Sequence, residues 1–152
     1  MIFRPMHLMP TILILASAAA TLFMTGLIWF VQCVHYPLLA SVARADFPAY
    51  HRRHTAWTTW IVAPPMILEA ISAALLPWFR PAGVMPWQPW AALALVIVIW
   101  LSTALLQMPC HGVLAKGFDV AVHHRLVRGN WLRTVAWSLR SALVLWMLVR
   151  CL

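Results

Sequence analysis

Residues 11–31 read TILILASAAATLFMTGLIWFV and contain no charged side chain. About twenty consecutive apolar residues are enough for an α-helix to cross the hydrocarbon core of a bilayer. Three further apolar runs follow, separated by short segments that hold prolines and charges. The sequence therefore predicts an all-α fold. We expect a single transmembrane domain over residues 1–152, a bundle of four membrane helices at roughly 10–36, 50–77, 89–114 and 120–151.

The composition supports the same class of protein. Hydrophobic residues make up 64% of the chain and charged residues only 9%, whereas a soluble domain usually carries about 25% charged residues. The formal net charge is +8, but the basic residues stand singly or in pairs near the predicted helix ends. This spacing lacks the basic face that nucleic-acid binding requires. We expect no nucleic-acid partner, and we expect the basic residues to contact membrane lipid headgroups.

The distribution of basic residues predicts the orientation in the membrane. The first and third connections between helices hold six of them, and the opposite side holds three: Arg44, Arg52, Arg53, Lys116, Arg125 and Arg128 against Arg4, Arg80 and Arg150. Lysine and arginine are enriched in cytoplasmic loops. We therefore predict a multi-pass protein of the bacterial inner membrane with both termini in the periplasm.

The first and third predicted helices end in similar sequences. Residues 32–37 read QCVHYP and residues 107–111 read QMPCH, so a glutamine, a cysteine, a histidine and a proline occur at each end. We interpret this similarity as two parallel hairpin repeats. Proline lacks the N–H group that a helix interior needs, so we expect Pro37 and Pro109 to kink or end their helices.

Two charged residues fall near the middle of predicted membrane helices. Glu69 is the only carboxylate in an apolar run, and Arg140 lies at a similar depth in the last helix. A charge at the bilayer centre is costly, so it normally faces the bundle interior and has a partner. We predict that the two residues pair, either as a structural ion pair or as catalytic groups in a polar site. Arg133 lies on nearly the same face as Arg140, and together they would suit an acidic headgroup, a propionate or a phenolate.

Six histidines fall at the predicted cytoplasmic ends of helices: His35, His51, His54, His111, His123 and His124. Neutral imidazole is the commonest metal ligand in proteins, and helix bundles build metal sites from His and Glu on facing helices. We favour His35, His54, His111 and Glu69 as metal ligands, with His35 and His111 also as candidate catalytic residues. The alternatives are acid/base histidines without a metal, and interfacial histidines that bind water, backbone or headgroups.

Amide and aromatic side chains complete the predicted site. Gln32 and Gln107 each lie about one turn before the histidine that ends their helix, and a buried glutamine must find hydrogen-bond partners. They would either bond to each other or orient the histidines and hold a ligand. Asn130, Arg133 and Trp137 recur at helical spacing and share one face. We include all five as candidate substrate-binding residues.

Three segments carry a resemblance to a known family: GLIWFVQCVHYPL at 26–38, residues 50–69, and NWLRTVAWSLR at 130–140. They resemble small bacterial four-helix membrane proteins of the anthrone-oxygenase-like kind, which implies an oxygenase-like enzyme. A fainter similarity, to the small haem-binding protoporphyrinogen oxidases, rests on Gly26, Trp29, His35, Tyr36 and Pro37. The apolar body of the first helix has no histidine where that family would place a haem ligand. Haem is therefore less favoured than a transition metal.

The expected function is that of a membrane oxidoreductase acting on a lipophilic substrate, aromatic or isoprenoid, with or without a metal. The alternative is a non-catalytic membrane protein: a metal or proton carrier, or an assembly partner. Homo-oligomerisation stays open. The sequence holds neither a glycine-rich phosphate loop nor a G-x-S-x-G motif, which argues against nucleotide chemistry and serine hydrolysis.

Overall fold

A computed structural model describes residues 8–151 of the chain, all of whose regular elements are helical. In chain order these elements are α1 Leu8–Phe30, the π-helix η2 Val31–His35, α2 Tyr36–Leu38, the 3-10 helix η3 Leu39–Ser41, α3 Phe47–Leu75, α4 Trp87–Ser102, the π-helix η4 Thr103–Gln107, α5 Met108–Leu114 and α6 Val120–Val149.

These elements join into four long helices: Leu8–Ser41, Phe47–Leu75, Trp87–Leu114 and Val120–Val149. Each is long and apolar enough to cross a membrane. The predicted all-α bundle of four membrane-length helices is therefore confirmed. Most of the predicted boundaries agree to within a few residues, and the first helix extends further than expected.

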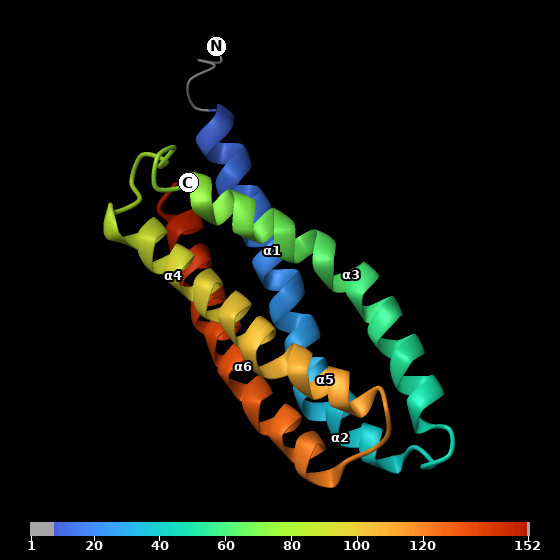
Figure 1. Ribbon diagram of the computed structural model, residues 1–152. Coiled ribbons are helices and arrows are strands. Elements are labelled where there is room, and N and C mark those ends of the chain that lie inside the picture. The colour runs from blue at the N-terminus through green and yellow to red at the C-terminus, as the bar shows by residue number, and fades with distance from the viewer. Residues whose placement is uncertain (1–7, 152) are drawn as a thin grey trace.

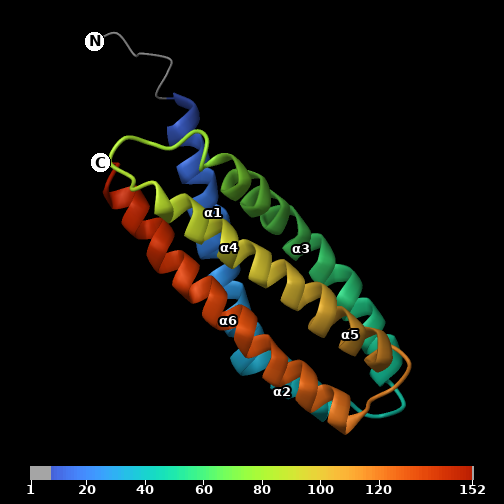
Figure 2. The same cartoon turned by 60° about the vertical axis from the view of Figure 1, so that its left-hand side comes forward.

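The long helices form one elongated bundle (Figures 1 and 2). α1 packs against α3 and α6, and α4 packs against α6, while α3 contacts α4 less. The connections at 42–46 and 115–119 lie at one end of the bundle. The connection at 76–86, the start of α1 and the end of α6 lie at the other end. The internal repeat and the orientation in a membrane stay predictions.

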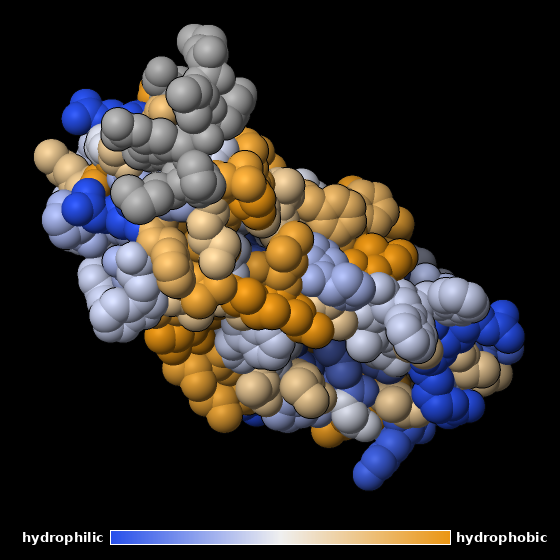
Figure 3. All heavy atoms as spheres, turned by 90° about the horizontal axis from the view of Figure 1, so that it is seen from above, coloured by the Kyte–Doolittle hydropathy of each residue, from blue (hydrophilic) through white to orange (hydrophobic). Residues whose placement is uncertain are grey.

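The outer surface of the bundle is apolar. Large side chains such as Trp57, Trp60 and Leu105 are 67%, 77% and 65% exposed. Figure 3 shows hydrophilic residues gathered toward the two ends of the view and mostly apolar residues between them. A soluble monomer rarely exposes so much contiguous apolar surface, whereas a bilayer solvates it. The surface therefore agrees with a multi-pass membrane protein.

Two π-helical segments carry the first and third long helices through their prolines. In η2 the N–H of Tyr36 donates to the carbonyl of Val31, and after η4 the N–H of Met108 donates to Thr103. Each π segment directly precedes a short helix with proline near its start. A proline ring would clash with the carbonyl four residues earlier in a regular α-helix, and the wider turn accommodates the ring. Pro37 and Pro109 therefore end neither helix, contrary to one of the outcomes we expected.

The connection at 76–86 is held against the end of α6. Gly83 has φ +87°, and a Cβ atom there would collide with the backbone carbonyl of Arg150. Only glycine adopts this conformation at little cost. The first and last helical hairpins are thus tied together at the end opposite the histidines.

Candidate functional site

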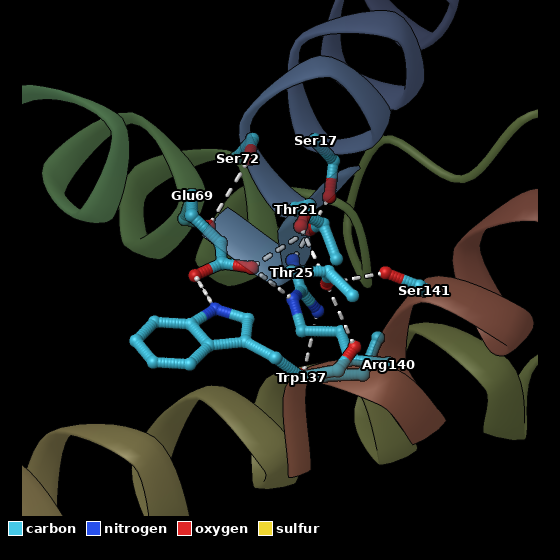
Figure 4. Close-up of polar contacts among 9 residues, drawn as sticks. Ser17, Thr21, Thr25, Glu69, Ser72, Trp137, Arg140 and Ser141 are labelled. Carbon is cyan, nitrogen blue, oxygen red and sulfur yellow. Dashed lines mark hydrogen bonds and ion pairs between the residues drawn. The ribbon is translucent and has the colours of Figure 1, made fainter. Parts of the chain in front are cut away.

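The predicted pairing of Glu69 and Arg140 is confirmed. Arg140 Nε donates to Glu69 Oε1 at 2.8 Å, and both side chains are 0% exposed. Thr21 also donates to Oε1, at 2.7 Å, and the Trp137 indole donates to Oε2 at 3.0 Å. Figure 4 shows these side chains converging from α1, α3 and α6.

The remaining donors of Arg140 are also satisfied. One terminal nitrogen donates to the Ala92 carbonyl at 2.7 Å and the other to Ser17 Oγ at 2.9 Å. Neither member of the ion pair has a buried polar atom without a partner. A closed network of this kind leaves no position for a substrate atom, so the geometry favours the structural alternative. It gives no support to catalytic roles for Glu69 and Arg140, or to substrate binding by Trp137, whose indole is engaged inside the network.

A second polar group lies toward the other end of the bundle, where four histidines and a tyrosine meet. His35 and His54 approach with their Nε2 atoms 3.1 Å apart, and His111 Nδ1 lies 3.3 Å from His51 Nε2. The Tyr36 hydroxyl lies 3.1 Å from His111 Nε2. We call these five residues the histidine cluster.

The cluster is assembled from three of the four long helices. His35 and Tyr36 come from η2 and α2, His51 and His54 from the first two turns of α3, and His111 from α5. A neutral imidazole has one donor and one acceptor nitrogen, so linked rings can pass protons to one another. The arrangement is therefore suited to acid/base chemistry.

The residues predicted as metal ligands do not come together. Glu69 lies fifteen positions after His54 on α3, which is about 22 Å along a helix axis. Within residues 8–151, no three His, Cys, Asp or Glu side chains are grouped so that they could hold a metal ion. The set of His35, His54, Glu69 and His111 is thus corrected: its histidines join the cluster, and Glu69 belongs to the ion-pair network.

A cavity of about 450 Å³ adjoins the histidine cluster. Its size is typical of sites for small organic ligands. Its wall is largely apolar and includes several polar side chains. The apolar lining residues include Met24, Ile28, Val62 and Met66, and the polar ones include Tyr36, His54, Gln107, His111 and Arg133.

The cavity reaches the surface between α3 and the α4–α5 helix. Three of its lining residues are exposed there: Thr59, and Trp100 and Met108 at 41% and 63%. The surrounding surface is apolar, with Trp60 and Leu105 strongly exposed. We call this the lateral opening. In a bilayer it would face the acyl chains.

Two buried polar residues in the cavity wall have side-chain atoms without a partner among the described residues. Gln107 is 2% exposed, and neither its amide oxygen nor its nitrogen has a hydrogen bond within the described chain. Arg133 is 7% exposed, and its Nε is also without a partner there. Because buried polar groups are normally hydrogen-bonded, these atoms are candidate contacts for a ligand in the cavity.

Gln107 and Gln32 do not bond to each other, which corrects one of our two expectations for them. Gln32 accepts from Asn130 at 2.9 Å and donates to the Val127 carbonyl at 3.3 Å. Asn130 in turn accepts from Arg133 at 3.3 Å. Gln32 and Asn130 therefore lie behind Arg133 and position it, and neither lines the cavity.

Two members of the cluster, His51 and Tyr36, were not among the predicted site residues, and Tyr36 entered only through the haem-binding resemblance. His51 is fully buried, and its ring stacks on Phe47 with centroids 5.4 Å apart. Its spacing of three residues from His54 was the available signal. Tyr36 is 4% exposed, and its backbone carbonyl is 2.8 Å from His123 Nε2. His124 is exposed.

No protein-family profile, curated protein sequence or solved structure shows significant similarity to the chain. The function therefore has to be argued from the cavity and the groups around it.

Proposed function

We propose that this integral membrane protein binds a lipophilic small molecule with an oxygen-bearing polar end, and acts on it by acid/base chemistry. The observation that carries the proposal is the position of Gln107. Its unpartnered amide lines the same cavity as His111 and Tyr36. A ligand oxygen bonded to this amide would lie near groups that can exchange protons.

The apolar wall and the lateral opening support a lipophilic ligand. Met24, Ile28, Val62 and Met66 offer contact surface that a water-soluble metabolite would not use well. A molecule dissolved in the bilayer would reach the cavity between α3 and α4 without crossing a polar layer. Lipids and lipophilic compounds are therefore the proposed partners.

Acid/base chemistry would involve three side chains in the wall. His111 Nε2 and the Tyr36 hydroxyl share a hydrogen bond at 3.1 Å, so one can donate while the other accepts. His111 Nδ1 bonds His51 at 3.3 Å, which offers a route for a proton away from the cavity. His54 adds a third titratable group beside Thr58.

The oxidoreductase expected from the sequence is the more specific form of this proposal. In this form, the substrate would donate electrons to an acceptor such as dioxygen or a quinone, and the histidines would carry the accompanying protons. The resemblance to anthrone-oxygenase-like proteins and the bacterial inner-membrane location belong to this form. A non-catalytic carrier would bind the same molecule in the same cavity and leave it unchanged.

Binding can be tested with the purified protein in lipid nanodiscs. The probe is pyrenebutanol, a neutral lipophilic alcohol, detected by energy transfer from the tryptophans to pyrene. Ala63 lines the cavity, and Ala56 is exposed on the same helix outside it. We expect saturable binding to the wild type and to Ala56→Phe, and a loss of binding in Ala63→Phe. The proposed site would be refuted if Ala63→Phe binds the probe as well as the wild type does, or if the wild type shows no saturable binding.

Catalysis can be tested on lipophilic molecules that co-purify with the protein, identified by mass spectrometry. Two incubations are compared, one with dioxygen and one without it. We expect the wild type to convert such a molecule in at least one of them. His111→Gln should still bind it without converting it. A molecule that binds in the cavity and is returned unchanged by the wild type under both conditions would support the carrier.

A further inference from the structure

Arg133 is a buried cation with no anionic partner in the described part of the chain. It is 7% exposed and lines the cavity. Among residues 8–151 the only ion pair joins Glu69 to Arg140. The other two carboxylates of the chain, Asp46 and Asp119, are exposed in the connections. Within residues 8–151, no side-chain carboxylate therefore pairs with Arg133.

The groups that do surround Arg133 are neutral. It donates to the Asn130 amide oxygen at 3.3 Å, and its guanidinium carbon lies 5.1 Å from the centroid of the Trp137 ring. The Tyr36 hydroxyl is also close, and a phenol is ordinarily uncharged at neutral pH. A buried charge is normally paired, because desolvating it alone is costly.

Arg140 provides the comparison within the same helix. It lies seven residues further along α6, and it has both a carboxylate partner and a full set of hydrogen bonds. Among the described residues, Arg140 thus has an anionic partner and Arg133 has none. The arginine without an anion is the one in the cavity wall.

The Gln107 amide lies close to α6, about one turn before Arg133. A Cβ atom built on Gly129 would be 3.2 Å from Gln107 Nε2, and Gly129 is four residues before Arg133, on the same face of α6. The Gln107 Nε2 and Arg133 Nε groups are therefore two unused donors at one part of the wall. Two donors, one of them charged, match an oxygen that carries negative charge.

We propose that the ligand is a lipophilic anion, with its anionic oxygen bound by Arg133 and Gln107 and its apolar body in the rest of the cavity. This inference rests on the proposed function and narrows its substrate class to lipophilic acids, such as carboxylic acids or ionised phenols. The anion would supply the charge that the chain does not provide. A planar guanidinium suits such a group better than a lysine would.

The test compares pyrenebutyrate with pyrenebutanol in nanodiscs of neutral lipid. Each probe concentration is expressed per lipid, because the two compounds partition differently into the bilayer. A charge-assisted hydrogen bond in a buried site is expected to favour the anion by about tenfold or more. Arg133→Met should remove this preference. Arg125→Gln is the control, because it removes one exposed charge near the same end of the bundle.

A second variant covers the case in which Arg133→Met does not fold. Gln107→Leu breaks no hydrogen bond of the described chain, and it should reduce the preference for pyrenebutyrate several-fold. If the wild type binds both probes equally and Ala63→Phe abolishes the binding of both, the anion proposal fails and the proposed function stands. If Arg133→Met keeps the full preference, the anion proposal also fails. If neither probe binds saturably, both fail.

Discussion

Replacing Arg140 by methionine tests what holds the centre of the bundle together. The change keeps a long apolar side chain and removes three hydrogen bonds: those to Glu69, to the Ala92 carbonyl and to Ser17. It leaves the Glu69 carboxylate 0% exposed, with only Thr21 and Trp137 as side-chain donors. Removing one partner of a buried ion pair costs about 3–5 kcal/mol, because the other charge stays buried.

The matched variant is Arg133→Met on the same helix. It removes the long hydrogen bond to Asn130, at 3.3 Å, and the contact with the Tyr36 hydroxyl, and it also removes a charge that lacks an anionic partner among residues 8–151. We expect a change in unfolding free energy below about 1 kcal/mol, or a gain in stability. The double variant Glu69→Gln/Arg140→Met should recover part of the loss, because the residue left at position 69 is then neutral.

The assay is reversible unfolding of each variant in mixed micelles, with SDS as the denaturant and circular dichroism as the readout. Arg140→Met should shift the midpoint strongly toward lower SDS, and Arg133→Met should not. Equal losses in the two variants, or no recovery in the double variant, would mean that the ion pair does not stabilise the bundle. Such a result would also remove the contrast between the two arginines.

Three further predictions follow from other parts of the molecule. Gly83→Ala should destabilise the protein by roughly 1–3 kcal/mol, since its positive φ and the Arg150 carbonyl both disfavour a Cβ atom. The same SDS titration measures the loss. The control is Gly112→Ala, where a Cβ atom meets nothing within 4 Å. Gly129→Ala should weaken pyrenebutyrate binding several-fold with little effect on folding, because its methyl group would displace the Gln107 amide; unchanged affinity would contradict the position we give that amide. Alkaline phosphatase fused after residue 152 should be active in bacterial cells, and a fusion in the connection at 115–119 should be inactive. The reason is that this enzyme folds only in the periplasm. The reverse pattern would overturn the predicted orientation.

The four helices and the central ion pair were predictable from the sequence because they depend on local properties. The length of an apolar run determines whether a helix can cross a bilayer. The cost of an isolated charge in such a run requires a partner, and Arg140 was the residue at matching depth to Glu69. The distance between Glu69 and the histidines was calculable too. Applying the helical rise to α3 would have separated the ion pair from the metal set.

The composition of the cavity wall was beyond the sequence, because it depends on how each helix is rotated about its axis. One extra residue in a π-turn rotates everything after it by about 100°. Such turns occur in η2 and η4, immediately before Tyr36 and Met108. Regular helical spacing therefore misplaces the side chains that follow, Tyr36 among them.

The sequence by itself determined an apolar four-helix bundle with a few buried polar groups, since hydrophobicity depends on the chain alone, although we expected Glu69 and the histidines in one site. Only the tertiary structure decided which of those groups satisfy one another and which do not. The Gln32 amide bonds to Asn130, while the Gln107 side-chain amide has no hydrogen bond within the described residues. The two glutamines nevertheless occupy similar places in the sequence. Partners are assigned by packing between helices, and that packing leaves Gln107 and Arg133 facing the cavity.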